Sequence, residues 1–434
     1  MMKFYKQFLF LIILCSELIS FSSFAKENNS KYYKKFQEVF EKIEREYVKE
    51  PNKQELVDAA IEGMLSSLDP HSGFFVDEDL DFFVSNTKGE FGGIGVEIIY
   101  ENGAIKVISP IDDLPAFKAG IKSGDYIVKV NNELVSNLGY NKAVIELRGK
   151  PGTVVKVTVI REGESKPLEF DLTREIVKIN AVKTSLDNNI AYIRVSTFSE
   201  KAAQELKKAF ATLDAQAKEK KEKIDGIILD LRNNPGGLLD QGIAVADYFI
   251  NEGVIVSTKG RDSSSEIIFS ASSGSEKAPS IPMVVLINGG SASASEIVAG
   301  ALQDHKRAII AGTKSYGKGS VQTFFPMDHR SAIKFTTGIY YTPSGRSIQA
   351  EGIVPDVLIE IAKVEYPKKD DDQFKFSEAT LKNHLKNEKE GDKKDEAKQK
   401  EPKKLSDSYY KDFQYARAYD LLQGILILEK KNER

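Results

Sequence analysis

The spacing of apolar residues predicts two helices near the start of the chain. From Tyr32 to Tyr47 apolar residues recur every three or four positions, as on one face of an amphipathic helix, and Pro51 ends the pattern. A second helix is expected over Glu55–Leu68, before the turn residues Asp69-Pro70. We expect this helical region, residues 26–88, to be a packing surface within its own domain or against a partner subunit.

Residues 89–173 change to short alternating strands separated by turn residues, with a helical stretch at Tyr140–Leu147. A glycine segment, Phe91-Gly-Gly-Ile-Gly-Val96, is expected to form a loop that leads into a strand. A short helix and a turn are expected between Leu114 and Ile127. The expected strands are Ala104–Ile108, Asp125–Val130, Val154–Ile160 and Leu168–Leu172.

This combination of a glycine loop, a short helix and several strands resembles a PDZ domain. Successive backbone N–H groups in such a loop can hold the terminal carboxylate of a peptide that adds to the sheet as a strand. The alternative is a small β module whose glycines only make turns. The expected carboxylate-binding residues are Gly92, Gly93, Ile94, Gly95 and Val96.

Residues 174–365 alternate between apolar strands and helical segments. This order implies crossover connections and a largely parallel sheet covered by helices, which is an α/β class of fold. The expected strands are Gly226–Leu231, Met283–Asn288, Arg307–Ala311, Val321–Phe325 and Ile333–Tyr341, and the expected helices are Leu238–Ile250 and Ala294–Asp304.

Residues 1–25 have the pattern of a cleaved signal peptide. Lys3 and Lys6 precede a short apolar run, and Ser23-Phe24-Ala25 supplies small residues for a cleavage site. The apolar run is too short to cross a bilayer as a helix, although a retained membrane anchor is the alternative. We therefore expect export, most simply to a bacterial periplasm.

Residues 366–434 differ from the rest of the chain. Most residues between Lys386 and Lys404 are charged, which predicts a solvated, disordered linker. Beyond it, Tyr409–Leu428 is apolar enough to form one amphipathic helix that docks back on the body of the protein.

Composition limits the classes of function. The hydrophobic fraction of 41% is sufficient for a sizeable core. A formal net charge of −3 gives no electrostatic reason to expect a nucleic-acid partner. The chain has one cysteine, Cys15 in the predicted leader, so a mature chain would have neither a disulfide nor a catalytic thiol.

Candidate chemistry begins where an apolar strand runs through a glycine turn into a helix. Ser291, Ser293 and Ser295 alternate with alanines there, and a strand-to-helix turn is a geometry that exposes a nucleophile. Free backbone N–H groups and the positive end of the helix dipole could stabilise an oxyanion at the same place. The alternative is that these small residues cap the helix and allow tight packing.

A serine nucleophile also needs a base. His305 lies 12 residues beyond Ser293, about 18 Å along a continuous helix, so it cannot reach back. Lys318 is a better candidate, because burial between glycines would lower its pKa and favour the neutral amine. Gln322 could orient that amine. The other histidines leave a Ser-His-Asp site open but unsupported: His71, His329 and His384.

A nucleotide-binding loop is a second interpretation of the same lysine. Gly312-Thr-Lys-Ser-Tyr-Gly-Lys318 has the spacing of a phosphate-binding loop, and Asp230 ends a strand as a magnesium-binding aspartate would. However, Gly319 stands where a hydroxyl should bind magnesium, and the next residues predict a strand instead of a helix. Asp230 and Arg232 are otherwise an ion pair that shapes a turn, or surface charges.

Several motifs in a fixed order, from about Tyr32 to Asp356, closely resemble the carboxy-terminal-processing serine proteases, also called tail-specific proteases. The resemblance implies a crotonase-like or ClpP-like α/β core that carries an inserted PDZ domain. The motifs are Leu68-Asp-Pro-His-Ser, Gly92-Gly-Ile-Gly-Val, Ala119-Gly-Ile-Lys-Ser-Gly-Asp, Leu147-Arg-Gly-Lys-Pro-Gly-Thr, Asp230-Leu-Arg-Asn-Asn-Pro-Gly-Gly, Gly290-Ser-Ala-Ser-Ala-Ser-Glu-Ile, Tyr316-Gly-Lys-Gly and Tyr341-Thr-Pro-Ser-Gly-Arg-Ser-Ile-Gln.

The resemblance also implies roles for individual residues. It places the nucleophile 25 residues before the lysine, which selects Ser293 as nucleophile and Lys318 as base, with Gln322 orienting the lysine. No metal and no other cofactor is implied. The oxyanion hole would be formed by the backbone N–H groups of Gly236 or Gly237 and of Ala294.

The expected substrates are exported proteins with free C-terminal tails, which the PDZ segment would bind. Arg148, in the turn Leu147-Arg-Gly-Lys, either couples this binding to the catalytic core or only stabilises its turn. An adaptor protein and a homodimer formed by the helical ends are further candidate partners.

Overall fold

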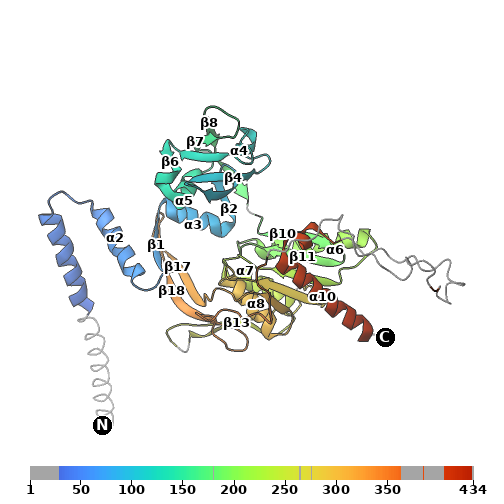
Figure 1. Ribbon diagram of the computed structural model, residues 1–434. Coiled ribbons are helices and arrows are strands. Elements are labelled where there is room, and N and C mark those ends of the chain that lie inside the picture. Colours follow the sequence, from blue (N-terminus) through green and yellow to red (C-terminus); the bar gives the residue numbers. More distant parts are fainter. Residues whose placement is uncertain are drawn as a thin grey trace, which may run out of the picture. The chain divides into compact units, whose positions relative to one another are not determined.

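The computed structural model describes residues 29–178, 180–262, 265–274, 276–362, 385 and 405–432 (Figure 1). The predicted signal peptide and the predicted charged linker, Lys386–Lys404, lie outside these residues. The chain forms two compact units, Met1–Phe74 and Phe75–Arg434. Within the described residues, no helix combines the length and the apolar character needed to cross a bilayer.

The described residues of the first unit, 29–74, contain two helices, as the periodicity predicts. Residues 29–46 are helical, and α2 spans Lys53–Ser66. Asn52 caps α2, because its side-chain oxygen accepts a hydrogen bond from the N–H of Gln54 at 3.0 Å. The apolar stripe of the first helix is largely exposed, with Tyr32, Phe36, Val39 and Ile43 among the exposed apolar side chains. Strand β1 (Gly73–Val76) spans the boundary to the second unit.

The second unit contains a sheet with strand order β3-β4-β5-β7-β8, and β6 pairs with β5. Side chains such as Ile105, Val107, Ile127 and Val157 are fully buried and form its own core. Strand β3 is an edge strand among the described residues. The elements are β3 (Val96–Glu101), β4 (Ala104–Pro110), α4 (Pro115–Lys118), β5 (Tyr126–Val130), β6 (Glu133–Leu134), α5 (Val135–Leu147), β7 (Val154–Ile160) and β8 (Leu168–Thr173).

The predicted glycine loop over residues 91–96 is wrong in part. Gly92 and Gly93 lie in strand β2 (Glu90–Gly93), which pairs with β9 (Glu175–Lys178), and only Ile94 and Gly95 lie outside strands. A Cβ on Gly92 would lie 2.0 Å from the backbone oxygen of Gly149, so close packing across the two segments requires a glycine. The glycine motif therefore contains the end of strand β2 and a loop of two residues, Ile94 and Gly95.

A second sheet forms the larger core, with strand order β10-β11-β12-β15-β16-β19. Strands β11, β12, β15, β16 and β19 run parallel and β10 is antiparallel to β11, which confirms the prediction of a largely parallel sheet. The predicted strands Val321–Phe325 and Ile333–Tyr341 do not belong to it, because they pair antiparallel with each other in a separate sheet. The strands are β10 (Val182–Asp187), β11 (Ile190–Val195), β12 (Gly226–Asp230), β15 (Met283–Ile287), β16 (Ile309–Gly312) and β19 (Val357–Leu358). The sequence analysis did not anticipate β10 and β11.

Alternate side chains of this sheet pack against different helices. Ile227 and Leu229 of β12 join a core with α6 (Ala202–Glu219), α7 (Leu239–Phe249) and α8 (Ala294–Asp304). Ile228, between them, packs with Tyr415 and Leu422 of α10 (Phe413–Asn432), the long red helix in Figure 1. Because neighbouring residues of a strand point to opposite faces, helices cover both faces of the sheet. The prediction that the C-terminal helix docks on the body is confirmed.

The predicted helix over Tyr409–Leu428 is not continuous. It is divided into α9 (Asp407–Lys411) and α10, and Asp412 between them has extended backbone angles, φ −122° and ψ 100°. The remaining elements are α3 (Glu78–Lys88) and a group of antiparallel strands, β13 (Val254–Lys259), β14 (Ile267–Ser270), β17 (Ser320–Pro326) and β18 (Ser331–Tyr341).

Gly312, at the end of β16, is expected to tolerate no side chain. Its φ is +116°, and a Cβ would lie 2.1 Å from the backbone oxygen of Ile287 on the neighbouring strand. We expect Gly312→Ala to lower the free energy of unfolding by about 3 kcal/mol or more, because the clash is with backbone. Gly345→Ala is the matched control, since Gly345 has a φ of +82° but no atom within 4 Å; it should cost about 1–2 kcal/mol. Equal losses in denaturant titrations would contradict this account.

Candidate active site

The turn between β15 and α8 holds Ser293 in an unusual conformation. Ser293 directly precedes α8 and has φ +55° and ψ −114°, which few residues other than glycine adopt. Such strain is typical of functional turns, where the surrounding structure holds the residue in place. Here the Ser293 N–H donates a hydrogen bond to Glu296 Oε2 at 2.8 Å.

The three serines of this turn have different environments. Ser291 and Ser295 are fully buried, and their hydroxyls donate at 2.8 Å to the backbone oxygens of Leu231 and Asn234. These two hydroxyls therefore hold the β15–α8 turn to the segment after β12. Ser293 is partly exposed and lines a pocket.

That pocket, of about 1050 Å³, brings together five of the residues that the sequence analysis selected. Much of its remaining surface is apolar, and no histidine is among its described lining residues. A Ser-His-Asp site is therefore not supported here. The five selected residues are Gly236, Gly237, Ser293, Lys318 and Gln322, and the apolar lining includes Phe83, Leu238, Ile243, Phe269 and Phe324.

Lys318 lies in the loop between β16 and β17, and its flanking glycines permit close packing. A Cβ on Gly319 would lie 2.4 Å from the backbone nitrogen of Gln349. Gly317 has a φ of +93°, and a Cβ there would lie 3.2 Å from backbone atoms of Ala350 and Gly352. The glycines thus allow the lysine loop to lie directly against the segment 349–352.

The Glu296 carboxylate joins the serine turn to the lysine loop, and the sequence analysis missed it. Glu296 is fully buried. Besides the N–H of Ser293, it accepts hydrogen bonds from Ser315 Oγ at 2.6 Å, from the N–H of Gly317 at 2.6 Å and from the N–H of Lys318 at 2.9 Å. One buried anion therefore fixes the backbone on both sides of the site. The spacing Ser293-x-x-Glu296, typical of a capping box, was the available signal.

These contacts also exclude the phosphate-binding loop. In such a loop the backbone N–H groups bind phosphate, but here those of Gly317 and Lys318 donate to the carboxylate of Glu296. The residues after Gly319 form strand β17 and not the helix that a phosphate-binding loop requires.

Gln322 is held at its amide nitrogen. Nε2 donates to Ser320 Oγ at 2.8 Å and to Thr336 Oγ1 at 3.2 Å. Both protons of the amide group are thereby used, so the other end of the side chain, Oε1, is the acceptor available to a donor in the pocket.

The glycine turn after β12 lies directly against the start of α8. A Cβ on Gly236 would be 2.8 Å from Cβ of Ser293 and 3.1 Å from the backbone nitrogen of Ala294. Gly236 has φ +101° and its N–H donates to Asn234 Oδ1 at 2.9 Å, so that N–H is engaged within the turn. Gly237, with φ +145°, is the exposed member of the pair at the pocket. The geometry favours Gly237 over Gly236 as the donor to an oxyanion.

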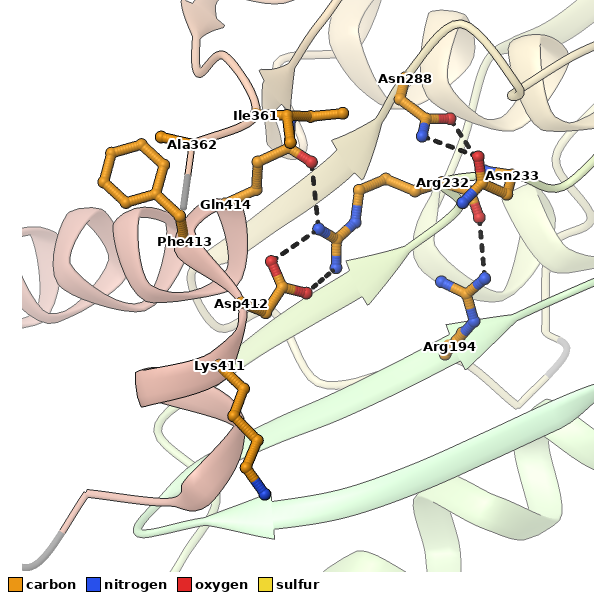
Figure 2. Close-up of a pocket in the computed structure, with 10 residues that line it drawn as sticks. All are labelled: Arg194, Arg232, Asn233, Asn288, Ile361, Ala362, Lys411, Asp412, Phe413 and Gln414. Carbon is orange, nitrogen blue, oxygen red and sulfur yellow. Dashed lines mark hydrogen bonds and ion pairs between the residues drawn. The ribbon is translucent and has the colours of Figure 1, made fainter. Parts of the chain in front are cut away.

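Asp230 and Arg232, at the end of β12, form a buried ion pair at 2.7 Å and are not surface charges. Figure 2 shows Arg232 at a second pocket, of about 390 Å³, where it also binds Asp412. Burial alone would lower the pKa of the Arg232 guanidinium, but the hydrogen bonds that it donates to Asp230 and Asp412 raise the pKa above its ordinary value. Burial and the charge of Asp230 likewise raise the pKa of Tyr192, whose hydroxyl donates to Asp230 at 2.8 Å.

Arg148 does not line the active-site pocket. It follows α5, and its guanidinium lies over the rings of Phe91 at 3.9 Å and Phe82 at 4.8 Å. Burial lowers the pKa of Arg148 from its ordinary value. The residue thus packs the PDZ segment against α3, which contributes Phe83 to the pocket.

Within the described residues, no group of histidine, cysteine, aspartate or glutamate side chains could hold a metal ion.

Three family models match parts of the chain. Residues 189–359 match peptidase family S41, residues 92–172 match the PDZ domain, and residues 15–79 match the N-terminal domain of the activating protease CtpB. The family match thus includes both the serine turn and the lysine loop.

The chain is also similar to whole proteins. It is 46% identical over 399 residues to a carboxy-terminal-processing protease of Bartonella bacilliformis, covering 92% of this chain and 90% of that protein. It is 36% identical over 348 residues to the carboxy-terminal processing protease CtpA of Bacillus subtilis, covering 79% and 72%. Among solved structures, the photosystem II D1 C-terminal processing protease has a TM-score of 0.46 and 31% identity, covering 75% of this chain and 92% of that one.

Proposed function

We propose a serine–lysine mechanism for this chain, which belongs to peptidase family S41 and is a carboxy-terminal-processing protease. Ser293 is the nucleophile and Lys318 is the general base of an endopeptidase that cuts proteins near their C-termini. The observation that carries the proposal is the shared carboxylate of Glu296, which holds the backbone of both residues beside one pocket.

The reaction follows from these positions. Ser293 Oγ attacks the carbonyl carbon of the scissile peptide while the neutral amine of Lys318 takes its proton. The oxyanion that forms accepts hydrogen bonds from the N–H groups of Gly237 and Ala294. The C–N bond then breaks, Lys318 returns the proton to the leaving amine, and water hydrolyses the acyl-enzyme with Lys318 again as base. Gln322 orients the amine through its Oε1.

Substrate capture is assigned to the PDZ domain. Strand β3 is an edge strand of the described sheet, so an extended tail can pair with it, as in strand addition. The terminal carboxylate would lie at the turn Ile94–Gly95 and the start of β3 at Val96, where the chain leaves β2. Gly92 and Gly93 support this turn through strand pairing with β9.

Paired peptides that differ only in their last group test this assignment. We expect kcat/KM for a peptide with a free C-terminal carboxylate to exceed that of its C-terminal amide by about 10- to 100-fold, since a hydrogen bond to a charged group is worth about 1.5–3 kcal/mol. The control is a peptide amide with an internal aspartate, which carries a carboxylate in the wrong place. Equal cleavage of the free acid and the amide would contradict carboxylate recognition.

Location and partners are part of the same proposal. Export through a cleaved leader would place the enzyme with exported substrates, and the exposed apolar stripe of the helix over residues 29–46 is suited to a second copy of this chain. An adaptor that delivers substrates is compatible with a PDZ-containing protease. The molar mass of the full chain in solution tests the homodimer, and N-terminal sequencing of the secreted protein tests the cleaved leader.

A further inference from the structure

Asp412 connects the C-terminal segment to the segment that follows β12. Its carboxylate accepts two hydrogen bonds from the Arg232 guanidinium, from Nη1 at 2.9 Å and from Nη2 at 2.6 Å (Figure 2). Gln414 Oε1 accepts a third, from Nη1 at 3.1 Å. A two-point contact between arginine and carboxylate fixes orientation as well as distance. The C-terminal segment therefore determines where the Arg232 side chain lies.

Charge balance around Arg232 depends on this contact. Arg194 and Arg232 both bind Asp230, at 3.1 Å and 2.7 Å, so two cations share one carboxylate. Asp412 supplies the second negative charge, and the side chain of Arg232 is only 10% exposed. Without Asp412, the single carboxylate of Asp230 would have to neutralise both Arg194 and Arg232. A buried guanidinium without its full counter-charge is unfavourable in a low-dielectric interior.

The Arg232 backbone leads directly to the oxyanion turn. Its N–H and Nε both donate to Asp230 Oδ1, at 2.9 Å and 3.0 Å, so one carboxylate oxygen ties the Arg232 side chain to its own backbone. The next residues are also held: the Asn233 N–H donates to Asn288 Oδ1 at 2.8 Å, and the backbone oxygen of Asn234 accepts from the N–H of Ala292 at 3.0 Å. The turn of Gly236 and Gly237 follows immediately.

We infer that Asp412 is a positioning residue of the active site, which acts through Arg232 on the glycine turn that carries the oxyanion donor. Asp412 lies beyond residues 189–359, the range that matches the peptidase family. The catalytic part of the inference rests on the proposed serine–lysine mechanism.

Asp412→Asn is the informative variant. Asp412 Oδ1 also accepts the N–H of Tyr415 at 3.0 Å and so caps α10. Asparagine caps helices as well as aspartate does, so this change keeps the cap. It removes the negative charge beside Arg232 and replaces the oxygen that accepts from Arg232 Nη2 with an NH₂ group, which cannot accept. We expect kcat to fall by about tenfold or more with KM within about twofold, because a displaced oxyanion donor affects the transition state and not the ground state. Asp412→Glu should restore part of the loss.

The matched control is Asp407→Asn. Asp407 lies on α9 of the same segment and forms an ion pair with Lys411 at 3.3 Å, but its side chain is 92% exposed. This variant should have the kcat of the wild type. Amide hydrogen exchange of the full-length proteins gives a second readout that needs no activity: exchange over residues 231–238 should rise in Asp412→Asn and not in Asp407→Asn.

Two outcomes would overturn the inference: an unchanged kcat with unchanged exchange over residues 231–238, or a loss of kcat that matches a loss of folded protein with exchange raised throughout the core. If Ser293→Ala cleaved peptides as the wild type does, the serine–lysine mechanism would fail. The exchange measurement would still decide whether Asp412 holds this segment.

Discussion

Ser293→Ala is expected to abolish tail cleavage, lowering kcat by about 10⁴-fold or more, while binding of the tail peptide is retained. The nucleophile forms the bond that splits the reaction into two easier steps, so its removal eliminates the covalent route. We have proposed that the PDZ domain binds the tail, and its core is separate from that of the peptidase. Peptide hydrolysis by mass spectrometry and binding by fluorescence anisotropy measure the two properties on the same protein.

Serines of the same turn provide matched controls. Ser291→Ala and Ser295→Ala each remove a buried hydroxyl that donates to a backbone oxygen, so we expect a loss of stability of about 1–3 kcal/mol and not a loss of the nucleophile. Lys318→Ala should resemble Ser293→Ala in activity. Substantial cleavage by either Ser293→Ala or Lys318→Ala would contradict the mechanism. The mechanism would also be contradicted if Ser291→Ala failed to form the acyl-enzyme while Ser293→Ala still formed it.

The second large effect is expected for Glu296→Gln. This change keeps the size of the side chain but replaces a carboxylate that accepts four hydrogen bonds with an amide whose NH₂ group would face other donors. We expect kcat to fall by about 100-fold or more, because Ser293 and Lys318 lose their common anchor. The free energy of unfolding should fall by about 2–4 kcal/mol, since buried donors are left without acceptors.

Activity and stability must be separated in this experiment. Activity is measured at a temperature at which circular dichroism shows Glu296→Gln to be fully folded, so that the loss of kcat reports geometry. Glu266→Gln is a suitable control, since Glu266 forms an exposed ion pair with Lys259, at 3.5 Å, and such pairs contribute little to stability. A fully folded Glu296→Gln enzyme with wild-type kcat would show that the shared carboxylate does not position the site.

The part of the fold that the sequence predicts best is the buried parallel sheet. Continuous apolar runs such as Gly226–Leu231 and Met283–Asn288 correspond to β12 and β15, with ends that differ by one residue. Strand β10 was missed because most of its side chains are at least partly exposed and show no apolar run. Helix α6 was missed although Leu206, Phe210 and Leu213 recur at helical spacing, so its pattern was available.

The errors of prediction arise where distant segments decide the local structure. Gly92 could not be placed in a strand from its neighbours, because the backbone oxygen of Gly149, far along the chain, sets its environment. The break at Asp412 depends on Arg232, 180 residues earlier. Glu296 has the spacing of a helix cap, but its bonds to Gly317 and Lys318 exist only in the folded core. None of these contacts can be predicted from the residues that are adjacent in the sequence.

Under the proposed mechanism, the shared carboxylate of Glu296 also makes activity depend on the folding of the chain. Ser293 and Lys318 belong to separate loops, and a single buried anion brings their backbones to one place after β15, β16 and α8 have assembled. An unfolded polypeptide keeps the two groups apart and the amine solvated, so it has no hydrolytic capacity. Under the proposed mechanism, hydrolytic activity therefore appears only when this part of the fold is complete, and it is lost when the Glu296 contacts open.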